Sequence, residues 1–229
     1  MTEGRWASPW MTVLGAVLAL TVMGIAFDAY RLAVSMPSEP LIAFVESMAL
    51  GQGLASLAVV GFALAWPARL RWRGEIGLGL WVLGAYFVWM LLWVPFSLIL
   101  YPRFVTTEAQ PHLEYFVTEG ARSGLPVVLV VVCLVGPIAE GVVFRGYLQT
   151  GVKGLIGRWP ASITTSLLFG FMHGVDIGLP LALMGLFFGY LRDRDGGMVV
   201  PIAAHVLHNS VTVGSALGWP ELFHEVFSK

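Results

Sequence analysis

The chain has 229 residues, of which 57% are hydrophobic and only 12% are charged, and its mean hydropathy is +0.79. A soluble domain carries about 25% charged residues, so the composition excludes an ordinary globular protein with a polar surface. The net charge of −1 gives no support for a nucleic-acid partner. We therefore expect one membrane-embedded domain over residues 1–229, an all-α polytopic bundle of about seven to eight transmembrane helices.

The first three candidate spans lie in the N-terminal half, where apolar stretches reach the roughly 20 residues that a membrane-spanning helix needs. They cover about residues 9–30, 40–66 and 76–100. Because no convincing small-residue cleavage site follows the first stretch, we interpret it as an uncleaved helix and not as a signal peptide. A polar segment at 103–124 separates these spans from the rest.

Four further candidate spans follow the polar segment. The pair Trp159-Pro160 marks the start of one of them, since Pro is favoured in the first turn of a helix. The charged run RDRD at 192–195 and the two glycines after it mark the end of another. The first of the four begins near Pro126 and continues through Gly146 toward Lys153, and the second begins near Pro160. The last two cover about residues 178–191 and 198–217.

Loop charges predict the orientation, because cytoplasmic loops carry an excess of Lys and Arg. The stretch 68–75 holds three Arg, and with seven spans the basic residues after the fourth span and the RDRD run fall on the same side. We therefore expect a multi-pass protein of the plasma (inner) membrane with a cytoplasmic N-terminus. Residues 103–124 then lie on the side of the membrane away from the cytoplasm.

Polar side chains interrupt the apolar spans of the C-terminal half. A charge at the bilayer centre costs about 2.5 to 3.5 kcal/mol on insertion scales, so such groups mark a functional site or a partnered residue. Taken singly, an intramembrane His is more often a packing residue, and an Asn usually joins two helices. Together, in neighbouring helices, they favour a site. These residues are Glu140, His173, His205, His208 and Asn209.

Spacing places some of these groups on shared helix faces. His205 and Asn209 are four positions apart, as are Phe169 and His173. A Glu can act as general base on a water with a His assisting, while a second His and an amide donate hydrogen bonds to a developing oxyanion. The same Glu and His residues can instead hold a zinc ion with water in an open position. The residues leave both mechanisms open.

Three short motifs resemble those of a known family. Glu140 with FRG at 144–146, then Phe169 and His173, then His205 and Asn209, resemble the motifs of the CPBP family of intramembrane proteases, which includes CAAX prenyl proteases and bacteriocin-processing proteins. The resemblance covers about residues 120–217 and implies that this region is the catalytic core of a mostly helical membrane protease.

The resemblance also implies roles for individual residues. Glu140 and His173 would activate a water, and His205 and Asn209 would stabilise the oxyanion. Arg145 and Phe169 would support the site, and a zinc ion, where one is bound, would be held by Glu140, His173 and His205. The substrate would be a peptide or protein, lipidated in one class of the family, which the enzyme meets among membrane lipids.

The chain departs from the family at one position. The first motif of the family usually reads Glu-Glu-x-x-x-Arg, whereas the second Glu is replaced here by Gly141. On a regular α-helix, positions 141 and 145 suit an ion pair, while Glu140 lies about 140° from Arg145 and is free to face a cavity. We therefore expect Gly141 to leave Arg145 without that partner. Arg145 would then anchor the helix end near the cytoplasmic headgroups.

Three functions fit the sequence. The first is an intramembrane endopeptidase whose cavity opens toward the cytoplasm. The second is a non-catalytic binding protein or bacteriocin self-immunity protein on the same scaffold, which the loss of the second Glu favours. The third is a transporter or proton pathway, because scattered Glu and His residues in membrane helices also suit a relay. We rank the third last, since the two halves of the chain do not read as repeats.

Overall fold

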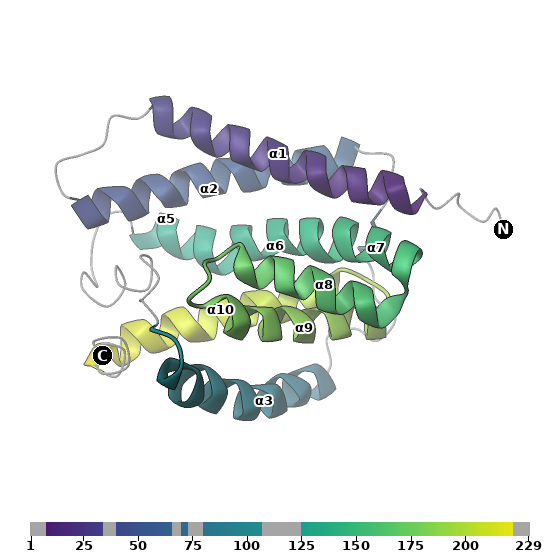
Figure 1. Cartoon of the computed structure of the whole chain (residues 1–229). Helices are drawn as coiled ribbons and strands as arrows, with labels where there is room; N and C mark the ends of the chain where they lie inside the picture. The colour runs from purple at the N-terminus through teal and green to yellow at the C-terminus, as the bar shows by residue number, and fades with distance from the viewer. Residues whose placement is uncertain (1–7, 34–39, 66–69, 73–79, 107–124, 222–229) are drawn as a thin grey trace.

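The protein is described from a computed structural model that covers residues 8–33, 40–65, 70–72, 80–106 and 125–221 (Figure 1). Helices make up nearly all of these residues, and no strand occurs within these ranges, which confirms the predicted all-α class there. Three helical stretches are long and apolar enough to cross a membrane, and a shorter apolar one covers Ala49–Ala65. The three long stretches are Pro9–Ala26, Leu80–Arg103 and Leu125–Ile156.

The helix boundaries follow the predicted spans closely. In the N-terminal half the helices are α1 (Pro9–Ala33), α2 (Pro40–Ala65) and α3 (Leu80–Pro95), which continues through η1 (Phe96–Leu100) and η2 (Tyr101–Arg103). One continuous helix then comprises α5 (Leu125–Val130), η3 (Val131–Val135), α6 (Gly136–Glu140), η4 (Gly141–Leu148) and α7 (Gln149–Ile156). The last three helices are α8 (Arg158–Phe171), α9 (Gly178–Asp195) and α10 (Val199–Gly218). The start of the third predicted span and most of the polar segment, residues 107–124, lie outside the described residues.

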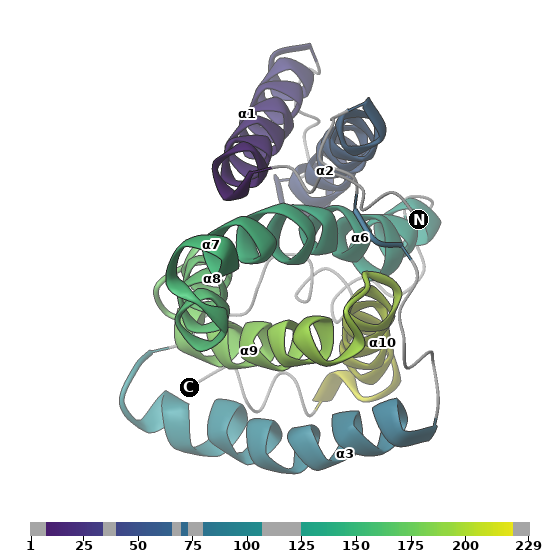
Figure 2. The ribbon, with the colours of Figure 1, turned by 90° about the vertical axis from the view of Figure 1, so that its right-hand side faces the viewer.

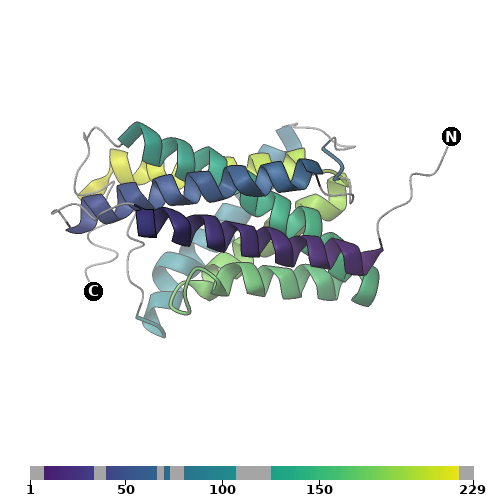
Figure 3. The same cartoon turned by 90° about the horizontal axis from the view of Figure 1, so that it is seen from above.

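Four helices surround the centre of the molecule. In Figure 2 the long helix, α8, α9 and α10 form a ring, with α1 and α2 on one side of it and α3 on the opposite side. Seen from above, α1 and α2 lie side by side across the molecule (Figure 3). The ring therefore carries the C-terminal motifs, while α1, α2 and α3 cover its outside.

Large apolar side chains point outward as well as inward. Three leucines on the outer helices are each more than 70% exposed: Leu64 on α2, and Leu80 and Leu91 on α3. In water such a surface would be unfavourable, whereas hydrocarbon tails solvate it without cost. The outer helices are therefore suited to contact lipid.

The long helix contains two π-helical segments, η3 and η4. In a π-helix the backbone hydrogen bonds join residues i and i+5, and such segments often occur at functional sites. The Gly136 N–H donates to the Val131 carbonyl at the end of η3, and the Gln149 N–H donates to the Phe144 carbonyl at the end of η4. The wider turns change which side chains share a face of this helix.

Three segments that the sequence predicts on one side of the membrane meet at one end of the bundle. The Met198 N–H donates to the Arg71 carbonyl at 2.9 Å, so the loop after α2 lies against the α9–α10 turn. Lys153 and Arg158 both pair with Asp193. This confirms that the basic segments share one end, and the assignment of that end to the cytoplasm stays a prediction.

Candidate active site

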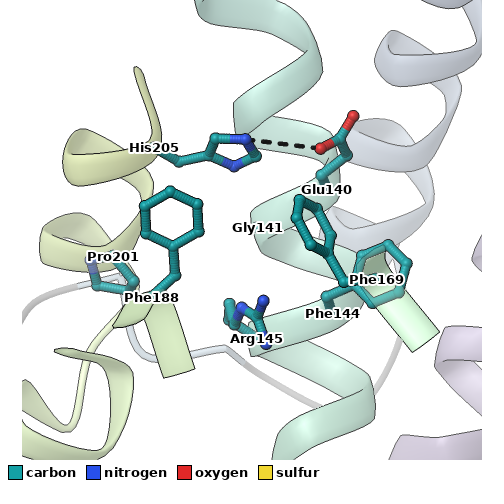
Figure 4. A pocket seen from close by; sticks show the side chains of 8 residues that line it. All are labelled: Glu140, Gly141, Phe144, Arg145, Phe169, Phe188, Pro201 and His205. Atoms are coloured by element: carbon teal, nitrogen blue, oxygen red, sulfur yellow. Dashed lines mark ion pairs between the residues drawn. The ribbon is translucent and has the colours of Figure 1, made fainter. Parts of the chain in front are cut away.

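A small pocket lies inside the ring of four helices, and its lining side chains are drawn in Figure 4. It brings together two predicted catalytic residues and two predicted supporting residues. The long helix, α8, α9 and α10 all contribute side chains to it. The lining residues are Glu140, Gly141, Phe144, Arg145, Phe169, Phe188, Pro201 and His205.

Glu140 and His205 face each other across this pocket. The His205 Nε2 lies 3.7 Å from the Glu140 Oε2, and the two side chains are 8% and 19% exposed respectively. This separation is too long for a direct hydrogen bond and too short for a water between the two atoms, but it suits contact between two charges or a water beside the pair. Phe188 stacks on the His205 ring with 4.6 Å between centroids, which fixes the ring plane. The pair is therefore held in a mostly apolar environment.

Phe169 lies between several of the predicted site residues. Its ring centroid is 4.8 Å from that of His173 and 5.7 Å from that of His205. The guanidinium carbon of Arg145 lies 5.4 Å from the same ring centroid, and Phe144 packs edge-on against it. This position is consistent with a supporting role for Phe169, because its ring contacts side chains from the long helix, from the turn after α8 and from α10.

His173 lies in the turn directly after α8, beside the pocket and not in its lining. Its Nδ1 is 2.7 Å from the Phe169 carbonyl oxygen. A carbonyl oxygen can only accept a hydrogen bond, so Nδ1 must carry the proton. In the neutral ring Nε2 is then the free acceptor, which is the state that an assisting base requires.

Asn209 lies one helical turn after His205, but its amide binds elsewhere. The Asn209 Nδ2 donates to the Val132 carbonyl at 2.8 Å. In the π-helical pattern that carbonyl would accept from residue 137, and Pro137 has no N–H to give. Asn209 thus joins α10 to the long helix. Its second amide hydrogen stays available, since an amide carries two N–H donors.

The prediction that Arg145 reaches the headgroups is wrong, because its side chain is only 2% exposed and lines the pocket. The prediction assumed a regular α-helix, in which Glu140 and Arg145 point in different directions. They are instead joined by η4, whose i to i+5 pattern returns Arg145 to the face that carries Glu140. Its Nη1 and Nη2 have no hydrogen-bond partner within the described part of the chain.

Gly141 occupies the position where the family usually has its second Glu. A Cβ atom built on Gly141 would lie 2.5 Å from the Cγ1 atom of Ile202 on α10, and Gly141 is itself buried. A glutamate there would need the Ile202 side chain to shift. The glycine is therefore matched to the packing of this chain, and Arg145 lies instead beside Phe169 and Gly185.

His208, the remaining intramembrane histidine, lies outside the pocket lining. Its Nδ1 is 3.5 Å from the Tyr86 hydroxyl, and the ring of Trp93 packs edge-on against it at 5.1 Å. Both aromatic residues belong to α3. His208 therefore attaches α3 to α10, which agrees with its being offset from the face that carries His205.

A zinc ion held by Glu140, His173 and His205 does not fit this arrangement. Over the described residues, no three His, Cys, Asp or Glu side chains come together in a way that could hold a metal ion. His173 is outside the pocket lining. Zinc sites in enzymes use three protein ligands, and the pocket offers the pair Glu140 and His205.

The sequence did not identify Phe188 and Pro201 as parts of the site. Both lie in apolar helices where an aromatic or a proline is unremarkable, so no local pattern distinguishes them. They belong to the pocket because α9 and α10 turn those positions inward. Phe144, by contrast, lies within the FRG motif.

Comparison with known proteins finds similarity to membrane peptidases over the C-terminal half of the chain. Residues 122–211 match the family model described as Type II CAAX prenyl endopeptidase Rce1-like. The chain is also 31% identical over 90 residues to "Putative membrane peptidase YdiL" of Bacillus subtilis (strain 168), which covers 39% of this chain and 37% of that relative. No solved structure matches the chain.

The matched region contains the three motifs and all the residues that line the pocket. Residues 122–211 begin just before the long helix and end within α10, so they include Glu140, His173, His205 and Asn209. The apolar helices and this match together indicate a multi-pass membrane protein. Residues 122–211 are thus similar to CAAX-protease-like membrane peptidases of the CPBP family, and the match spans 39% of this chain and 37% of the curated relative.

Proposed function

We propose that the protein is an intramembrane endopeptidase of the CAAX-protease-like type. The observation that carries this proposal is the separation of 3.7 Å between Glu140 and His205 inside a pocket formed by four helices. At this distance a water cannot lie between the two atoms, but one water beside the pair can contact both the carboxylate and the imidazole. The family match over the same residues supports a peptide or protein as the substrate.

In the proposed reaction, Glu140 takes a proton from a water as its oxygen attacks the carbonyl carbon of the scissile bond. The His173 Nε2 assists from the edge of the pocket. His205 and the second amide hydrogen of Asn209 donate to the oxyanion that forms. The proton then passes from Glu140 to the leaving amine, so that one water is consumed and a carboxylic acid and an amine are released.

The proposed setting is the plasma (inner) membrane, with the N-terminus in the cytoplasm. The meeting of Arg71, Lys153 and Arg158 at one end of the bundle supports this orientation, because basic residues are enriched on the cytoplasmic side. Lipidated peptides form one substrate class to test. Membrane lipids would surround the outer helices.

A second candidate is a non-catalytic binding or bacteriocin self-immunity protein on the same scaffold. Gly141 favours it, because the family usually has a second carboxylate at this position. Under this alternative, Glu140 would contribute to structure alone. The two candidates therefore make opposite predictions for a substitution at Glu140.

The deciding experiment is cleavage of a quenched fluorescent peptide library, part of it prenylated, by purified protein in detergent micelles or liposomes. We expect cleavage by the wild type and loss of cleavage in Glu140→Ala and Glu140→Gln. Asp176→Asn, which alters an acidic residue outside the pocket lining, serves as the matched control. If the wild type cleaves no peptide in the library, although its cooperative unfolding shows that it is folded, the result would favour the non-catalytic candidate.

A further inference from the structure

Polar residues form a regular ladder where three helices meet beside the pocket. Three sets of residues spaced four apart face one another along this interface. Residues four apart share one face of an α-helix, which aligns the sets on α8 and α9, and contacts with the two glycines place Arg145 and Gln149 along the same interface. The rows are Arg145, Gln149 and Lys153 on the long helix, Ser166, Ser162 and Arg158 on α8, and Gly185, Gly189 and Asp193 on α9.

The inner step of this ladder borders the pocket. A Cβ atom on Gly185 would lie 3.0 Å from the Arg145 Nη2 and 3.2 Å from the Cα of Ser166. The glycine therefore permits the guanidinium to lie against α9 and α8. Arg145 also lines the pocket with Glu140, so this step belongs to both the ladder and the site.

The middle step repeats the same arrangement one turn farther along. A Cβ atom on Gly189 would lie 2.6 Å from the Ser162 Oγ and 3.2 Å from the Gln149 Oε1. The Gln149 Nε2 donates to the Gly189 carbonyl at 3.0 Å. Both polar side chains are at most 2% exposed.

The outer step reaches the surface at the end of the bundle where the basic segments meet. The Gln149 Nε2 also lies 3.3 Å from the Asp193 Oδ2, which links the middle step to this one. Asp193 pairs with Lys153 and Arg158, and those two side chains are each 44% exposed. The outer and middle steps are thus joined by Gln149, and the inner step, one turn farther along, borders the pocket.

The buried steps contain polar atoms that the described residues do not satisfy. They are Arg145 Nη1 and Nη2, Ser166 Oγ, Ser162 Oγ and Gln149 Oε1. Each buried polar atom without a partner costs about 1 to 3 kcal/mol, so several in one row would be a large cost. Buried polar groups are ordinarily satisfied by internal water when protein partners are lacking.

We propose that this ladder is the route by which water reaches the pocket from the end of the bundle at Lys153 and Asp193. The inference rests on the proposed function, because hydrolysis consumes one water per turnover inside helices whose outer faces suit lipid. Arg145 forms the inner end of the route, beside Glu140. The two serines and Gln149 supply donors and acceptors for water along its length.

The route is tested by cysteine labelling in a Cys133→Ala background, which removes the single native cysteine. The variants are Ser162→Cys and Ser166→Cys, with Thr164→Cys on the exposed face of the same helix as the negative control and Lys153→Cys as the positive control. The probe is methyl methanethiosulfonate, which reacts with the thiolate, so labelling reports contact with water. The protein is held in liposomes so that lipid covers the outer faces.

We expect Ser162→Cys and Ser166→Cys to react within about tenfold of the Lys153→Cys rate and well above Thr164→Cys, because only water-exposed thiols ionise. Labelling that fails at position 166 while Lys153→Cys reacts would overturn the route, whether or not position 162 reacts. Thermal unfolding midpoints of all variants check that the helices stay packed.

A second measurement uses turnover. Gly189→Ala puts a methyl group into the middle step, and we expect kcat to fall roughly tenfold with KM unchanged, because the substrate does not contact this position. Gly214→Ala is the control, since a Cβ atom there meets nothing within 4 Å. An unchanged kcat for Gly189→Ala in an enzyme that Glu140→Ala inactivates would overturn the route and leave the protease proposal standing. An inactive wild type would refute the protease proposal, and the labelling would still decide the route.

Discussion

Glu140 and Arg145 lie five positions apart on one helix, and both side chains line the same pocket. On a regular α-helix they would point in directions about 140° apart. The π-helical segment η4 brings them together because its hydrogen bonds join residues i and i+5. Arg145 therefore lines the candidate active site, and its guanidinium lies in the same pocket as the proposed base, Glu140.

The packing of Gly141 leads to a prediction about stability. Gly141→Ala should lower the free energy of unfolding by about 1 to 3 kcal/mol, because its Cβ would lie 2.5 Å from the Ile202 Cγ1. The measurement is thermal or denaturant unfolding in detergent. Gly214→Ala, on the helix that carries Ile202, is the matched control because its Cβ meets no neighbour.

A double substitution makes this test specific. Ile202→Ala removes the atoms that a Cβ at position 141 would meet, so Gly141→Ala should cost less in that background than in the wild type. Equal costs in the two backgrounds would show that α10 does not restrict position 141.

Asn209 should contribute to both stability and turnover. Asn209→Ala removes the bond to the Val132 carbonyl and should cost about 1 kcal/mol of unfolding free energy, the usual scale for hydrogen bonds between membrane helices. If its second amide hydrogen binds the oxyanion, kcat should also fall by about 10²-fold. The two effects are separated by steady-state kinetics and unfolding on the same preparation. A loss of stability with unchanged kcat would assign Asn209 to packing alone.

His173 allows a test with two substitutions, one that can keep the Nδ1 hydrogen bond and one that removes both ring nitrogens. The amide of His173→Asn can replace the Nδ1 donor to the Phe169 carbonyl, while the assisting Nε2 is lost. We expect this variant to fold normally and to lose about 10²- to 10⁴-fold in kcat, as for removal of a general base. His173→Ala should lose the same activity and also stability. A His173→Asn enzyme with wild-type kcat would restrict His173 to a structural role.

Chelators should leave activity intact. The pocket offers Glu140 and His205 as a pair, and among the described residues no third His, Cys, Asp or Glu joins them as a metal ligand. Wild-type enzyme incubated with EDTA or 1,10-phenanthroline should therefore retain its kcat. Inhibition that added zinc reverses would contradict this expectation and would require His173 to move into the pocket.

The sequence alone determined the class and course of the chain. Stretches of about 20 apolar residues predicted the helices to within a few residues, because hydrophobic length and loop charge are local properties. The spacing of polar residues also identified the helices that carry Glu140, Phe169 and His205 before any contact between them was known. The basic segments were predicted to share one end for the same local reason.

Tertiary structure alone decided how those side chains face one another. Whether a helix takes a π-helical turn depends on packing against its neighbours, and that turn moved Arg145 from the expected headgroup position into the pocket. The bond from Asn209 to the Val132 carbonyl and the contact of Gly141 with Ile202 join residues more than 60 positions apart. No local pattern encodes such contacts, because they arise only when α10 packs against the long helix.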